Sequence, residues 1–172
     1  MKTILSRLKT LIQNEMVSGG DLTYVKDVEI VHPEIALTLI TIASLPKVLF
    51  TPVSSSEEWV ASGRKQVNNT ISAYLLLYYG QRESNIMGDT SRPAGQGKGI
   101  LDFVADFISV VRSHRLAVGG TNYLDKPLDI DGIDYSVEEL QGGQTGDLRL
   151  LIASVDIKAT RLIEQVSLPG NI

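Results

Sequence analysis

Residues 65 to 79 read KQVNNTISAYLLLYY, and this stretch decides the fold. Its odd-numbered positions carry the apolar side chains Val67, Ile71, Ala73, Leu75 and Leu77. A period of two is typical of a β-strand with one buried face. From residue 74 onward the even-numbered face turns apolar too, with Tyr74, Leu76 and Tyr78. We therefore expect another element or another subunit to cover that second face.

Further strands are predicted on both sides of this stretch. Short apolar runs between turn signals predict strands over residues 25–31 and 47–53, the second closing through Pro52 and a serine run. Residues 127–139 alternate apolar and acidic side chains, and the phase shift at Asp131-Gly132 predicts a bulge or tight turn. A glycine-rich turn at 141–146 then leads to a last strand over 148–161.

Two amphipathic helices complete the pattern. The first covers residues 1–16, with apolar positions Ile4, Leu5, Leu8, Leu11 and Ile12, and ends at Gly19-Gly20. The second covers residues 100–111, with apolar positions Ile100, Val104, Phe107, Ile108 and Val111. Residues 35–43 fit a strand or a helix, and we favour a short buried helix. The order of elements predicts a single α+β domain over 1–172, a mainly antiparallel sheet flanked by two principal helices.

One long loop interrupts this order. Residues 80–99 hold five glycines, Pro93 and little apolar content, so we expect a long flexible loop between the main strand and the second helix. Loops of this length in compact domains are usually functional or disordered. We expect this one to contact a partner through Arg82, Arg92 and Lys98, with Ile86 and Met87 as its apolar anchor. A tolerated insertion is the alternative, since lengthening a surface loop costs little.

Composition excludes several classes of protein. The 172 residues contain no cysteine, which excludes disulfides and thiolate zinc sites. The net charge is −4 and no basic run occurs, so nothing predicts sequence-independent binding to nucleic acid. The longest apolar stretch, residues 35–45, is too short and too polar to cross a bilayer. We expect no membrane contact and a soluble protein in the cytoplasm of the producing cell.

The candidate chemical motifs fail. Residues 95–99 read GQGKG before a helix, but a phosphate-binding loop needs a glycine where Arg92 stands and Ser or Thr where Gly99 stands. The acids of residues 129–138 have their glycine, Gly132, too early for a calcium loop. We expect no catalytic residue, no metal and no cofactor. Trp59 lies in a polar segment, where it anchors that segment on the core or forms an interface.

The chain resembles the tail-terminator and tail-completion proteins of long-tailed bacteriophages over nearly its whole length. The likeness rests on the N-terminal helix, the strand that opens with LPKVLF at 45–50, the long strand 66–79, the single helix 100–115 and the closing strand 147–161. The loop at 80–99 departs from the family, whose compact members have shorter connections. Another neck protein, such as a head-closure or tail-completion ring, therefore stays open.

The resemblance implies a structural protein and not an enzyme. Family members form rings, usually hexameric, that end the tail tube and join it to the head. The implied partners are further copies of the chain, the tail tube, the sheath where one exists, and the head-side connector, while DNA passes through without specific binding. The implied location is the tail–neck junction of the virion, after assembly in the host cytoplasm. Candidate interface residues are Trp59, Tyr74, Leu76, Tyr78, Arg82, Ile86, Met87, Arg92 and Lys98. A small enzyme or ligand-binding domain remains the alternative from another class.

Overall fold

A single mixed sheet of five strands organises the chain. The computed structural model describes residues 1–17, 19–32, 44–61, 63–79, 84–88, 97–112, 114–117, 120–143 and 146–164. The strands are β1 (Asp27–Ile30), β2 (Lys47–Ala61), β3 (Arg64–Tyr78), β4 (Asp129–Gly143) and β5 (Gly146–Glu164), in the spatial order β1-β2-β3-β5-β4. Together with two principal helices they confirm the predicted α+β class.

The strands pair in two ways. Strand β1 runs parallel to β2, with Asp27 opposite Lys47 and Ile30 opposite Phe50. Strands β2 and β3, β3 and β5, and β4 and β5 are antiparallel neighbours. The parallel pair was not predicted, because a period of two says nothing about strand direction. The spatial order places β1 and β4 at the two edges of the sheet.

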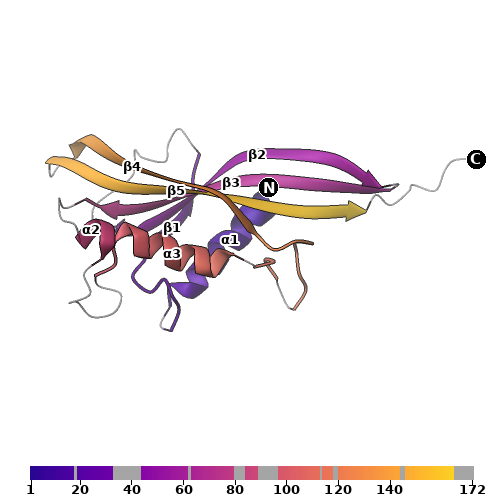
Figure 1. Ribbon diagram of the computed structural model, residues 1–172, viewed down its shortest axis with the longest axis horizontal. Helices are drawn as coiled ribbons and strands as arrows, with labels where there is room; N and C mark the ends of the chain where they lie inside the picture. Colours follow the sequence, from indigo (N-terminus) through magenta and orange to yellow (C-terminus); the bar gives the residue numbers. More distant parts are fainter. Residues whose placement is uncertain are drawn as a thin grey trace, which may run out of the picture.

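Helices α1 (Lys2–Glu15) and α3 (Ile100–Val111) cover one face of the sheet (Figure 1). Helix α3 has the bounds that its apolar period predicts, and α1 ends within a residue of its expected end. Their buried side chains meet the odd-numbered side chains of β3 in one core cluster, which includes Leu8, Ile12, Phe103 and Phe107. The tilted rings of Phe50 and Phe107, with centroids 6.2 Å apart, join the sheet to α3.

The opposite face of the sheet carries a second, smaller cluster. Its buried members are Leu45, Leu49, Leu76, Leu150 and Ile152, and Tyr74 packs against them. The apolar even-numbered positions near the end of β3 are therefore partly covered within one chain. The expectation of a covering element thus holds for Leu76, which is fully buried.

Strand β2 continues beyond the predicted end at residue 53, so that prediction was wrong. Its register with β3 runs on to Ala61 and Arg64, past a bulge between Pro52 and Ser54. Strand β1 ends opposite Phe50, so Pro52 lies where β2 has become an edge, and there a missing N–H costs no sheet hydrogen bond. The polar residues that follow form a strand because backbone pairing with β3 does not depend on side-chain polarity.

The remaining predictions stand as follows. The predicted phase shift in β4 is confirmed by a register irregularity between Ile130 and Gly132. A four-residue helix, α2 (Ser84–Met87), lies inside the segment expected to be loop. Residues 80–83 and 89–96 and the helix favoured at 35–43 lie outside the described residues. No helix in the described ranges is long and apolar enough to cross a membrane.

Candidate interaction surfaces

Three strands extend beyond the helix-covered core as a ribbon (Figure 1). We call this ribbon the arm and define it as residues 53–61 of β2, 64–70 of β3 and 159–164 of β5. On β5 it begins where pairing with β4 stops, because Asp129 of β4 lies opposite Lys158. Its exposed apolar side chains are Val53, Trp59, Val60, Leu162 and Ile163. The arm thus presents apolar groups that the core of the same chain does not cover.

Trp59 lies near the tip of the arm and is 58% exposed. It pairs across the strands with Lys65, whose ammonium lies 4.8 Å from the centroid of the indole, and Lys65 in turn lies opposite Ile163. Lys65 also forms an ion pair with Glu57 at 3.2 Å. Trp59 therefore does not anchor its segment on the core. Its large side chain is mostly exposed, and tryptophan is enriched among interface hot spots.

The even-numbered side chains of β3 divide into covered and uncovered groups. Leu76 is inside the second cluster and Tyr74 packs against it. Tyr78, at the end of the strand, is exposed. Of these three candidate interface residues, only Tyr78 is exposed, to 47%.

The loop candidates lie in different surroundings. Ile86 and Met87 are on α2 and are both exposed, Met87 to 59%. Helix α2 is held against the start of α3 through two glycines: a Cβ on Gly99 would meet the backbone nitrogen of Gly88 and the carbonyl oxygen of Ile86. Arg82 and Arg92 lie outside the described residues. The exposed apolar pair on α2 is thus fixed in place next to α3.

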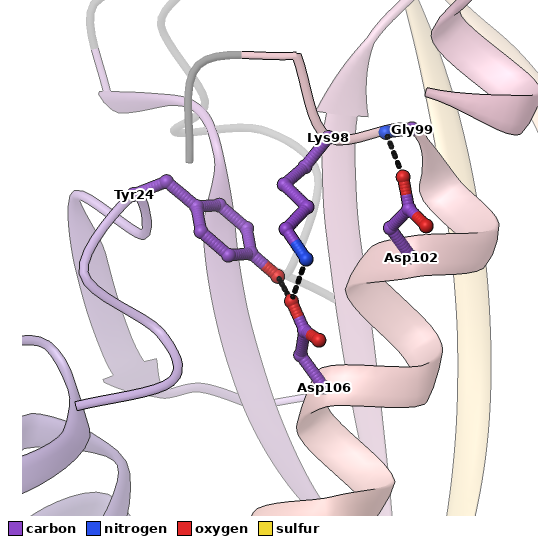
Figure 2. Close-up of polar contacts among 5 residues, drawn as sticks. All are labelled: Tyr24, Lys98, Gly99, Asp102 and Asp106. Atoms are coloured by element: carbon purple, nitrogen blue, oxygen red, sulfur yellow. Dashed lines mark hydrogen bonds and ion pairs between the residues drawn. The ribbon is translucent and has the colours of Figure 1, made fainter. Parts of the chain in front are cut away.

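Lys98 takes part in an internal cluster (Figure 2). Its ammonium lies 2.9 Å from Oδ2 of Asp106, and the hydroxyl of Tyr24 donates to that same oxygen at 2.9 Å. Burial, reinforced by the carboxylate of Asp106, raises the pKa of Tyr24, so its hydroxyl remains a donor. The cluster joins the segment after α1 to α3 and holds Lys98 at the end of the long loop.

Sequence reasoning missed a row of exposed apolar residues on β4. Ile133, Tyr135 and Val137 lie opposite Val155, Ala153 and Leu151, so they share the face that the helices cover elsewhere. Among the strands, α3 packs mainly on β3 and β5, and the row on β4 is exposed, Tyr135 to 52%. The alternation of apolar and acidic residues in this strand shows which side chains share a face. It does not show that β4 is an edge strand, where that face stays uncovered.

The acidic residues of β4 are engaged in different ways. Asp131 accepts from Lys158 at 2.7 Å, and Asp129 caps its own neighbour, the amide of Ile130. Across the described ranges, no three His, Asp or Glu side chains gather closely enough to hold a metal ion. The arrangement here is one of surfaces: an exposed arm, an exposed row on an edge strand, and an exposed pair on α2.

No family model matches the chain, and no curated protein shows significant similarity to it.

Proposed function

We propose that this chain is the subunit of a ring, most plainly a tail-terminator ring, that ends the tail tube of a long-tailed phage and joins tail to head. The observation that carries the proposal is the arm. It is a three-stranded extension of the sheet that passes both helices and keeps apolar side chains in solvent at its tip.

An arm of this kind needs a partner surface. Apolar groups such as Trp59, Val60 and Ile163 gain free energy when removed from water, at about 25 cal/mol per Å² of buried area. The eight residues of β2 from 54 to 61 span roughly 25 Å at the rise of an extended strand. A projection of this length reaches over a neighbouring subunit or down to a tube. The first contact would join subunits into a ring, and the second would hold that ring at the end of the tube.

Charge supports the same proposal. The chain carries a net charge of −4, and a ring of such subunits repels phosphate along its channel. DNA can then pass without being retained, since affinity for its backbone depends on clustered Lys and Arg. A head-to-tail contact between identical subunits closes into a ring when the rotation that relates neighbours is a whole-number fraction of 360°.

Sedimentation of the purified protein tests the proposal. We expect ring-sized species alone or on addition of tail tubes, and tubes that stop elongating when the protein is bound at their ends. Electron microscopy of the tubes distinguishes a tail terminator, which caps the tube, from a head-closure ring, which binds the connector. A chain that stays monomeric at high concentration and also with tubes present contradicts the ring.

A further inference from the structure

Two arginines from distant parts of the chain lie against one tyrosine ring. The guanidinium carbon of Arg7, on α1, lies 4.1 Å from the centroid of the Tyr123 ring, and that of Arg161, on β5, lies 4.4 Å from it. The two carbons are therefore at most about 8.5 Å apart, the sum of those distances, so their positive charges repel each other. Both arginine side chains and the ring are half-buried.

The backbone around the ring fixes its position. The amides of Tyr123 and Leu124 both donate to the carbonyl of Arg115, at 3.2 and 3.1 Å. Leu124 and Leu128 are buried in the main core cluster, so the segment that carries the ring is anchored on both sides of residue 126. Arg115 is exposed and its backbone lies beside Tyr123, so it adds a third cation to the same region.

Neither guanidinium on the ring has a carboxylate partner among the residues that the structure describes. Arg7 donates to the carbonyl of Leu116 at 2.8 Å, and Arg161 donates to the hydroxyl of Tyr123 at 3.0 Å. A guanidinium has five N–H groups, so within the described part of the chain most of these donors meet no acceptor. Asp125, two residues beyond the ring, accepts instead from a backbone amide of β5.

We propose that Arg7 and Arg161, held by Tyr123, bind one oxyanion, a phosphate or a carboxylate group. Such a group accepts two hydrogen bonds from the fork of a guanidinium, which brings its central atom to roughly 4 Å from the guanidinium carbon. One oxyanion can therefore contact both arginines, because their carbons are no more than about twice that distance apart. The inference does not rest on the proposed function, because the isolated chain carries the whole site.

A purely structural role for the two arginines is the alternative. They would then only hold the segment of Tyr123 against α1 and β5. Two like charges at one ring oppose that role, whereas a bound oxyanion removes the opposition. Nucleic acid is a poorer ligand for so small a cluster, because strong binding to duplex DNA draws on roughly 6–10 phosphate contacts.

Titration with inorganic phosphate tests the site, followed by nitrogen-15 NMR of the arginine Nε–H groups and by the melting temperature. The Nε–H signals of Arg7 and Arg161 should move with one common affinity. Arg7→Gln and Arg161→Gln each remove one guanidinium, so each should weaken phosphate binding roughly tenfold or more. The shift in melting temperature is taken within each variant, so a lower intrinsic stability does not change the comparison. Lys26→Gln, which removes an exposed cation outside the cluster, is the matched control and should bind phosphate as the wild type does.

The same titration with a blocked diglutamate peptide distinguishes the two sources of an oxyanion. Binding of phosphate or of the peptide that both arginine substitutions weaken supports the site, and the tighter of the two identifies the preferred group. Tyr123→Phe keeps the ring and frees an N–H of Arg161, so it should retain binding.

Two outcomes would overturn the site. Stationary Nε–H signals, with equal shifts in melting temperature for the wild type and both arginine variants, leave the arginines a structural role and leave the ring proposal untouched, because phosphate stabilises proteins generally without binding. Tight binding of duplex DNA at physiological salt, lost in both variants, replaces the oxyanion site by a nucleic-acid surface. That second result would also contradict the proposed passage of DNA without retention.

Discussion

The ammonium of Lys47 lies 2.8 Å from the carboxylate of Asp27, the residue opposite it in the parallel pair of β1 and β2. Glu29 lies 3.0 Å from the same ammonium. The Lys47 side chain is almost completely buried, whereas more than a third of each acid is exposed. Burial alone would lower the pKa of Lys47, but its hydrogen bonds to the two acids outweigh burial, and the pKa is raised. This contact joins the short strand β1 to the sheet.

Replacing this lysine should therefore loosen the β1 edge. Lys47→Met keeps the apolar stem but leaves Asp27 and Glu29 close together without a cation. Because the acids are partly solvated, we expect a loss of about 1–2 kcal/mol in unfolding free energy, less than the ~3–5 kcal/mol typical of breaking a fully buried pair. Urea denaturation measures it. Adding Asp27→Asn and Glu29→Gln to Lys47→Met should restore most of the loss. A Lys47→Met protein more stable than the wild type would contradict a stabilising role of the lysine.

The same pair predicts a dependence on acid pH. Burial would raise the pKa of Asp27, but the hydrogen bond and charge of Lys47 lower it below its usual value of 3.8. A carboxyl whose pKa is lowered on folding stabilises the protein above that usual value, and the stability is lost as pH falls through the folded pKa. Unfolding free energy should fall as the pH drops from about 5 to below 3.8, and Asp27→Asn should flatten part of that fall. Equal slopes in both proteins would show that other carboxyls dominate.

Gly99 provides a test of how α2 is held. A methyl group there would meet the backbone of Gly88 and lie 2.5 Å from the carbonyl oxygen of Ile86, so α2 must shift. We expect Gly99→Ala to lower the unfolding free energy by about 1–3 kcal/mol and to speed proteolysis near α2. Gly132→Ala is the matched control, because a Cβ there has nothing within 4 Å, and it should change stability by less than about 0.5 kcal/mol. Equal effects of the two changes would contradict the close packing.

Local periodicity was enough to predict much of the fold. Helix α3 and the irregularity at residues 130–132 followed from patterns that a few neighbouring residues define. The apolar positions of α3 pointed to the core, although Phe103, fully buried and edge-on to Tyr24 at 5.5 Å, was missed. Phe103 lies at the margin of the predicted apolar stripe of α3, next to Phe107 on the helix surface.

Properties that depend on distant pairing could not be predicted. Residues 54–58 are polar, and the stretch from 54 to 61 gives no period, so it forms a strand only because β3 lies beside it. Whether β4 is an edge strand depends on the order of all five strands, and so does the exposure of Ile133, Tyr135 and Val137. The parallel partner of β1 is likewise set by the whole sheet. Lys98 was expected to meet a partner, whereas its charge is paired with Asp106 in the same chain.

Trp59 should separate assembly from folding. Its side chain is more than half exposed, and the ammonium of Lys65 lies over the ring at 4.8 Å from its centroid. Trp59→Ala removes only an exposed cation–π contact from the isolated chain, so we expect a stability change below about 1 kcal/mol. If the arm packs on another subunit or a tube, the same change should weaken that association roughly 30-fold or more, as loss of a tryptophan hot spot does.

Two matched variants complete that experiment. Glu58→Ala alters the neighbouring exposed residue, whose side chain alternates to the opposite face of the arm, and should leave association unchanged. Lys65→Met removes the cation but keeps the indole, so it should retain most of the affinity if burial of the ring dominates. Sedimentation velocity across a concentration series, alone and with tail tubes, measures all three. If Trp59→Ala is as stable as the wild type and associates with the same affinity, the tip of the arm contacts no partner.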